Sequence, residues 1–116
     1  MTPYIFVGLE QNVQRCVILK VPIGMTKTEK IIAVCSQVYG ITPEQTKSKS
    51  QKKECFYARC SAMYLIRSIT GITLKSIGRI FNRDHSTVIY NLEIFHILLA
   101  QDATFRKLFG KIREIN

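Results

Sequence analysis

The sequence has few acidic side chains and no long apolar run. Seventeen Lys and Arg stand against only eight Asp and Glu, so the formal net charge of the 116 residues is +9. No apolar run reaches the roughly 18 residues of a membrane-spanning helix, and the first residues lack the charged and apolar segments of a signal peptide. We therefore expect a cytoplasmic protein. An excess of positive charge on this scale predicts a polyanionic partner, and nucleic acid fits better than a membrane surface.

The sequence also lacks the motifs of catalysis and metal binding. It has no GxxxxGK[ST] phosphate-binding loop, so ATP binding is not expected. Its four cysteines include no CxxC pair and there is no His pair at zinc spacing; buried reduced thiols are favoured over two disulfides. Asp84, His85 and Ser86 have the letters of a catalytic triad, but consecutive helix positions point about 100° apart and cannot form one. We expect no enzyme activity, no cofactor and no metal.

Two regions differ in their hydrophobic pattern. Within residues 1–25, the β-branched and aromatic runs Tyr4–Val7 and Cys16–Val21 have strand length and are separated by turn residues. They predict a short hairpin or an extended arm laid on the helices. From residue 26 onward the period is helical, so residues 26–116 are predicted to form one all-α domain, with residues 1–25 as its N-terminal arm.

Capping residues and helical spacing locate the predicted helices. The first helix is expected over Glu29–Gln37, capped by Thr26 or Thr28, and Thr42-Pro43-Glu44 opens a second, short helical turn. Four further helices are expected over about Glu54–Thr70, from Thr73 through Phe81, from Asp84 through about Ala100, and from Asp102 through about Ile112. Between the second and third of these, Thr46–Lys53 reads TKSKSQKK, with four lysines and no acid. Such a run is often only a solvated linker. One helix ahead of a DNA-reading element, however, it predicts a DNA contact.

The segment Thr73–Leu99 has the pattern of a helix-turn-helix. Gly78 lies inside the first helix, where it costs about 1 kcal/mol relative to Ala; its missing side chain would let the second helix cross closely. Along the second helix an apolar seam recurs at spacings of four, three and four residues, through Val88, Leu92, Phe95 and Leu99. That seam leaves the N-terminal end, Asp84–Thr87, exposed at the positive pole of the helix dipole. A recognition helix presents this same end to base edges and phosphates of duplex DNA.

The string Ile77–Val88, IGRIFNRDHSTV, resembles the signature of a known family, the C-terminal DNA-binding domain of the bacterial chromosomal replication initiator DnaA. The resemblance runs from about Thr26 to Ile112. It includes Ser48-Lys49, similar to a basic loop, and Ala58-Arg59 on the long helix. It implies a Trp-repressor-like helix-turn-helix that binds the short DnaA box as duplex.

The resemblance also implies roles for individual residues. Base edges in the major groove would be read by Asp84, His85 and Ser86. The DNA backbone would be held by Arg59, Thr87, Lys75 and Arg83. The adjacent minor groove would be approached by the loop residues Lys49, Gln51, Lys52 and Lys53.

The sequence departs from the family pattern in three ways. Asn82 stands where the family has two glycines, so the turn is one residue shorter and Asn82 is expected in the left-handed conformation. Gln51 replaces a minor-groove arginine, and Lys52 or Lys53 would supply the charge instead. Residues 1–25 are too short for the initiator's ATPase module, which implies a stand-alone copy. The cognate DNA sequence and the choice between replication and transcription stay open.

Two alternatives to a replication-related DNA reader remain. A degenerate helix-turn-helix can serve as a protein-interaction module, and the N-terminal arm could recruit a protein partner. A free-standing reader would also suit a transcriptional regulator of a phage or mobile element. Strong duplex binding at low salt and weak binding at high salt separates DNA binding from a pure interaction module.

Overall fold

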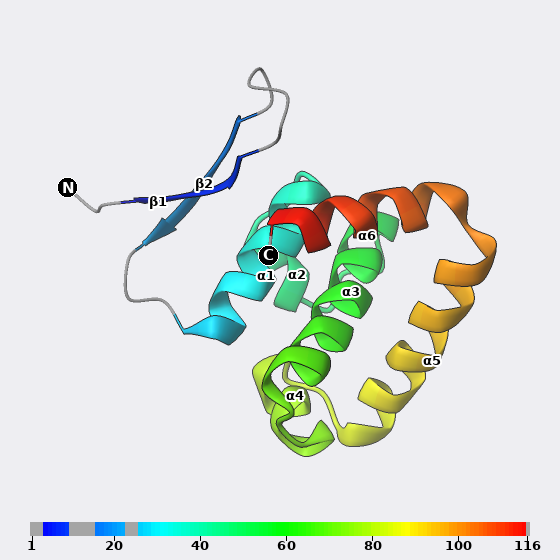
Figure 1. Cartoon of the computed structure of the whole chain (residues 1–116). Helices are drawn as coiled ribbons and strands as arrows, with labels where there is room; N and C mark the ends of the chain where they lie inside the picture. Colours follow the sequence, from blue (N-terminus) through cyan, green and yellow to red (C-terminus); the bar gives the residue numbers. More distant parts are fainter. Residues whose placement is uncertain (1–3, 10–15, 23–25, 116) are drawn as a thin grey trace.

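The computed structural model describes residues 4–9, 16–22 and 26–115 of the chain. Its main body is a set of helices, coloured from cyan to red in Figure 1. These are α1 (Lys27–Val38), α2 (Pro43–Lys47), α3 (Lys53–Thr70), α4 (Leu74–Ile80), α5 (His85–Gln101) and α6 (Ala103–Ile115). Each helix predicted from the sequence is present, so the all-α assignment of this region is confirmed.

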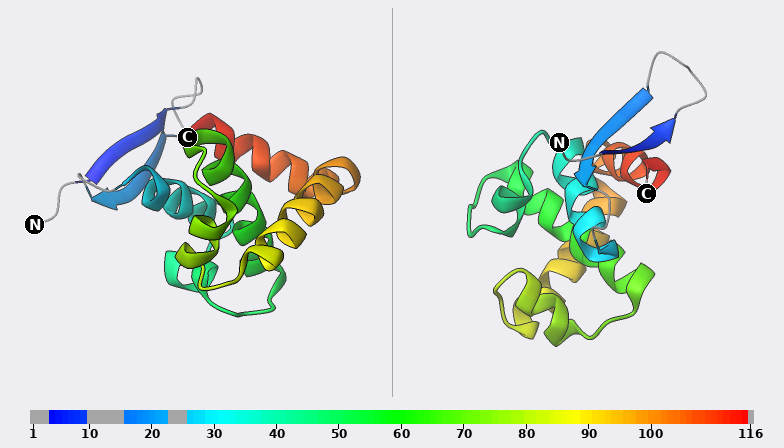
Figure 2. Two further views of the ribbon diagram at one scale, coloured as in Figure 1. Left: turned by 90° about the horizontal axis from the view of Figure 1, so that it is seen from below. Right: turned by 90° about the vertical axis from the view of Figure 1, so that its left-hand side faces the viewer.

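Two short strands precede the helices. β1 (Tyr4–Leu9) and β2 (Cys16–Pro22) pair in an antiparallel manner, with Phe6 opposite Ile18, and the register shifts on both sides of that pair. β2 contacts α1 and β1 contacts α6, and Figures 1 and 2 show the pair at the edge of the helical body.

Except for α3, whose cap position Lys52 makes no side-chain bond, the described helices begin where a side chain accepts a free backbone N–H. Of the two Thr residues that could start α1, Thr26 is the cap: its hydroxyl accepts from the Glu29 N–H, which sets the helix start two residues before the predicted Glu29. Thr42 caps α2 and forms a reciprocal capping box with Gln45. Thr73 caps α4, where its hydroxyl accepts from the Ser76 N–H. These caps are local in sequence, which is why the sequence alone located them.

The long helix α3 is central and contacts α1, α2, α4 and α5. Its inward residues Met63 and Ile66 are fully buried, together with Ile77 of α4 and Val88 of α5. In the same core, an aromatic cluster joins α3, α5 and α6: the ring of Phe95 stacks on Tyr64 of α3 at 4.2 Å and meets the α6 rings of Phe105 and Phe109 edge-on. This packing holds α5 against the core and leaves its N-terminal end at the surface (Figure 2).

The cysteines of the helical body belong to the core. Within the described part of the chain, Cys35, Cys55 and Cys60 are buried free thiols, whereas the side chain of Cys16 lies outside the described residues. Burial raises the pKa of the Cys60 thiol to about 12, although the nearby Arg59 charge partly opposes this shift. Burial also raises the pKa of Cys35. Both thiols are therefore neutral near pH 7. None of the described helices is long and apolar enough to cross a bilayer.

Candidate nucleic-acid interface

The turn between α4 and α5 is held by close backbone contacts. The Arg83 N–H donates to the Gly78 carbonyl at 2.7 Å, and a Cβ built on Gly78 would overlap the Arg83 carbonyl oxygen. Asn82 has φ 54°, so its predicted left-handed conformation is confirmed. The prediction about Gly78 needs a correction. The backbone that approaches it belongs to the turn residues Arg83 and Asp84 and not to α5 itself, because the short turn folds directly back over α4.

The first turn of α5 is capped by its own residues. Oδ1 of Asp84 accepts hydrogen bonds from the Thr87 N–H at 3.0 Å and from the Thr87 hydroxyl at 2.7 Å, and these bonds lower the pKa of Asp84. His85 and Ser86 lie between them and are exposed. All three residues predicted to read bases, Asp84, His85 and Ser86, are therefore exposed, but Asp84 also uses one carboxylate oxygen to cap the helix.

The lysine-rich segment between α2 and α3 is an ordered loop; its residues 48–52 are called the basic loop below. The Ser48 hydroxyl donates to the Gln45 carbonyl at 2.6 Å and accepts the Ser50 N–H at 3.2 Å. The Ser50 hydroxyl in turn accepts the Lys52 N–H at 3.2 Å. The serines are half-buried, whereas Lys49 and Gln51 between and beyond them are exposed. The loop thus turns its serines inward and presents Lys49 and Gln51 at the surface.

Arg59 lies beneath the basic loop and is only 3% exposed. Its Nε donates to the Thr46 carbonyl at 3.1 Å, and its Nη2 donates to the carbonyls of Ser48 at 2.6 Å and Ser50 at 3.1 Å. Burial lowers its pKa, and the positive charge of Arg83 lowers it further. Sequence reasoning assigned Arg59 to DNA phosphate and missed this structural role. The signal that could have suggested it is the position of Arg59 in α3, between the fully buried Ala58 and Cys60.

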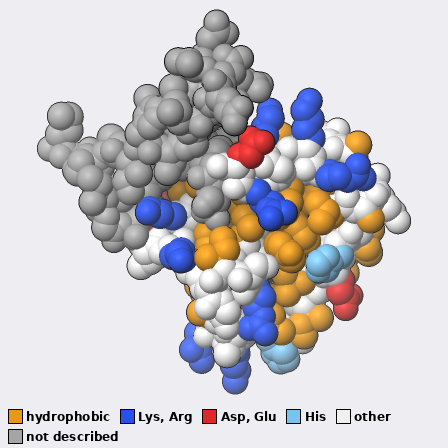
Figure 3. Space-filling model, in the orientation of Figure 1, with side chains coloured by type: hydrophobic (Ala, Val, Ile, Leu, Met, Phe, Trp, Pro, Cys, Tyr) orange, Lys and Arg blue, Asp and Glu red, His pale blue; other side chains and the backbone are white. Residues whose placement is uncertain are grey.

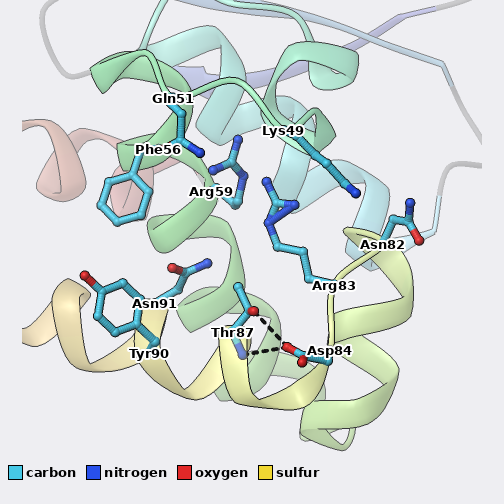
Figure 4. A pocket seen from close by; sticks show the side chains of 10 residues that line it. All are labelled: Lys49, Gln51, Phe56, Arg59, Asn82, Arg83, Asp84, Thr87, Tyr90 and Asn91. Atoms are coloured by element: carbon cyan, nitrogen blue, oxygen red, sulfur yellow. Dashed lines mark hydrogen bonds between the residues drawn. The ribbon is translucent and has the colours of Figure 1, made fainter.

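The carbonyl oxygen of Ser48 links the basic loop to the helix-turn-helix through a hydrogen bond. Nη2 of Arg83, in the turn before α5, donates to the Ser48 carbonyl at 2.9 Å, and the same oxygen accepts from Arg59. Figure 4 shows the two guanidinium groups side by side between the loop and the α4–α5 turn. Residues that are 35 positions apart in the sequence are thereby joined.

An open groove of about 540 Å³ lies between these elements. It is lined from the loop and α3 by Lys49, Gln51, Phe56 and Arg59, and from the helix-turn-helix by Asn82, Arg83, Asp84, Thr87, Tyr90 and Asn91 (Figure 4). Six residues predicted to contact DNA, namely Lys49, Gln51, Arg59, Arg83, Asp84 and Thr87, are thus brought to one groove. The basic loop and the first turn of α5 thus lie on the same face.

Other predicted residues lie apart from the groove lining. Lys53 begins α3 and holds its ammonium 5.4 Å from the centre of the Tyr57 ring, where it lines a different pocket. Lys52 and Lys75 are exposed, as are His85 and Ser86 at the outer edge of the α5 turn. Figure 3 shows that Lys and Arg side chains greatly outnumber acidic ones on the visible face of the helical body.

Four groove residues were not predicted as DNA contacts: Asn82, which was expected only as a turn residue, and Tyr90, Asn91 and Phe56. Tyr90 is 57% exposed and follows Ser86 by one helical turn, so it extends the outward face of α5. Asn91 is 3% exposed, and its Nδ2 donates to the sulfur of Met63 at 3.4 Å. Phe56 completes the apolar side of the groove. Tyr90 could have been found from helical spacing; the burial of Asn91 depends on the packing of α5 against α3.

The fold and the groove define a helix-turn-helix domain with a basic loop beside its second helix. Comparison with known families gives the particular one: the family described as "Bacterial dnaA protein helix-turn-helix" matches residues 28–94, and the chain belongs to it. This match covers α1 through most of α5 and identifies the region as the C-terminal DNA-binding domain of DnaA, which is a non-catalytic domain.

Curated relatives agree with this assignment. The chain is 35% identical over 86 residues to the chromosomal replication initiator protein DnaA of Thermus thermophilus, which covers 73% of this chain and 20% of the relative. It is 42% identical over 83 residues to the DnaA of Chlorobaculum tepidum, covering 71% of this chain and 17% of the relative. It is 30% identical over 118 residues to the DnaA of Microcystis aeruginosa, covering 97% of this chain and 27% of the relative. The chain thus spans about a fifth to a quarter of the length of these relatives.

Proposed function

We propose that the chain binds double-stranded DNA in a sequence-specific manner, with residues 26–116 as the binding unit. The observation that carries this proposal is the placement of the exposed first turn of α5 and the basic loop on one face, in a chain that belongs to the DnaA helix-turn-helix family. In a Trp-repressor-like arrangement, the first turn of α5 enters the major groove and the loop lies over the adjacent minor groove.

The exposed residues of the α5 turn suit base recognition. His85 and Ser86 project free donor and acceptor groups, and Asp84 keeps its second carboxylate oxygen available beside them. Thr87 and Arg83, and Lys75 on α4, lie at positions suited to phosphate contacts. Because Arg59 already bonds three carbonyls, its contribution to phosphate binding is mainly its positive charge and the shape it gives the loop.

The relatives' role in replication initiation suggests a DnaA-box-like site as the target. The loop bears Gln51 where the family has an arginine, and an amide can hydrogen-bond in the minor groove but brings no charge. We therefore expect a preferred sequence that is related to the DnaA box and differs from it at the base pairs that the loop approaches.

Selection from random duplex DNA with the purified chain tests the proposal. Enrichment of a single motif is expected, followed by fluorescence-anisotropy titration of that duplex at several salt concentrations. If about four to six phosphates are neutralised, the slope of log K against log salt is roughly −4 to −5. A slope near zero contradicts DNA binding, and enrichment of no motif reduces the chain to a non-specific binder.

A further inference from the structure

The basic loop is tied to the helix-turn-helix by very few bonds. Among the described residues, its internal bonds run between Ser48, Ser50 and Lys52 or to α2, and Arg59 of α3 supports it from below. The Arg83 side chain supplies the hydrogen bond that joins the loop to the turn before α5. Among the described residues, this bond is the direct link between the loop and the turn before α5, beside the support that Arg59 gives from α3.

The backbone of Arg83 has a fixed position relative to α4 and to the start of α5. Its N–H is bonded to Gly78, its carbonyl packs against the bare Cα of Gly78, and the preceding Asn82 holds the left-handed conformation. The next residue, Asp84, is the cap of α5. The backbone of Arg83 is thus fixed to the start of the recognition helix, while its side chain holds Ser48 of the loop.

The shared Ser48 carbonyl also offsets the repulsion between two neighbouring positive charges. The guanidinium groups of Arg59 and Arg83 are close enough for the charge of one to lower the pKa of the other. Each donates to the Ser48 carbonyl, whose oxygen has two lone pairs and can accept both. The oxygen therefore stabilises a pair of like charges at the edge of the groove, and a bond to a charged donor is about twice as strong as a neutral one.

We propose that Arg83 is a positioning residue: it holds the basic loop in a fixed register with the first turn of α5, so that loop and recognition helix bind DNA as one rigid unit. The proposal rests on the DNA binding proposed above. It assigns to Arg83 a role that removal of a charge alone does not reproduce. Any cation near the groove could attract phosphate, whereas among the described residues the Arg83 side chain is what links the α4–α5 turn to Ser48.

A test on the free protein needs no DNA. Amide exchange of Ser50 and Lys52, read by NMR, reports on the loop because their N–H groups are bonded within it. Arg83→Gln should raise both exchange rates several-fold. The matched control is Arg79→Gln, which removes an exposed positive charge from α4 and should leave both rates unchanged. Equal rates in wild type and Arg83→Gln, with both proteins folded by thermal melt, would overturn the proposal.

A mutant cycle tests the consequence for binding. Lys49→Ala should weaken binding to the selected duplex about tenfold in wild type, the size of one groove contact, but less than twofold in an Arg83→Gln background, since the displaced loop no longer delivers Lys49. In an Arg79→Gln background the full loss should persist. Additive losses with Arg83→Gln contradict the proposal. If wild type binds no duplex at all, the proposed function fails, while the exchange measurement still decides whether Arg83 holds the loop.

Discussion

In the proposed function, sequence recognition depends most directly on the side chains of His85 and Ser86. They lie exposed at the start of α5, between the mutually bonded Asp84 and Thr87. Because their side chains do not support the core, their replacement tests recognition without disturbing the fold.

We predict that Ser86→Ala and His85→Ala each lower affinity for the preferred duplex by about 1 to 3 kcal/mol and barely change binding to a scrambled duplex. Parallel anisotropy titrations on the two duplexes measure the difference, with thermal melts as the folding control. Equal losses on both duplexes would mean that the first turn of α5 does not read bases.

Arg59 contrasts with these residues, because it is buried under the loop it supports. Arg59→Ala removes donors from three carbonyls and should lower the free energy of unfolding by about 2 to 4 kcal/mol. Lys49→Ala, which changes an exposed loop lysine, should leave stability within about 0.5 kcal/mol of wild type. Urea unfolding measures both. If Arg59→Ala is as stable as wild type, water replaces Arg59 as the partner of the loop carbonyls with no loss in the free energy of unfolding.

At the scale of elements, α4 and α6 each contain one glycine, and the two differ in their surroundings. Gly78 in α4 faces the backbone of the turn, whereas a Cβ on Gly110 in α6 would meet nothing within 4 Å. The same substitution at the two sites should therefore have opposite effects.

Gly78→Ala should destabilise the protein by about 3 kcal/mol or more, because the methyl group would displace a backbone carbonyl and not a flexible side chain. Gly110→Ala should stabilise it by about 0.5 to 1 kcal/mol through helix propensity. Urea denaturation of the two variants beside wild type gives both values. Similar changes in the two variants would contradict the packing described for the α4–α5 turn.

Local features of these elements could be predicted from the sequence, and features set by tertiary packing could not. The caps at Thr73 and Asp84 depend on residues three positions away, and the left-handed Asn82 follows from the shortened turn. The burial of Arg59 and the sharing of the Ser48 carbonyl with Arg83 join three separate segments. No local pattern encodes such a junction, so the resemblance, which implied a phosphate contact for Arg59, did not predict its buried position under the loop.

At the scale of the whole molecule, α3 connects the core to the proposed reading surface. Its buried side packs against α1, α4 and α5, and its N-terminal half carries Phe56 and Arg59 to the groove. The helix that organises the core thus also sets the distance between the basic loop and α5. Destabilising the core near Met63, whose sulfur contacts Asn91 of the groove, would therefore also disturb the reading surface.

The serine-bonded loop has a consequence for the time course of binding. Since the loop carries its hydrogen bonds before any partner arrives, association pays little ordering entropy and needs no slow rearrangement. The rate should then be set by electrostatic steering and can exceed about 10⁷ M⁻¹s⁻¹ at low salt. In stopped-flow mixing, the observed rate should rise linearly with DNA concentration. A rate that levels off would reveal an ordering step, and with it a loop that takes its shape only on the duplex.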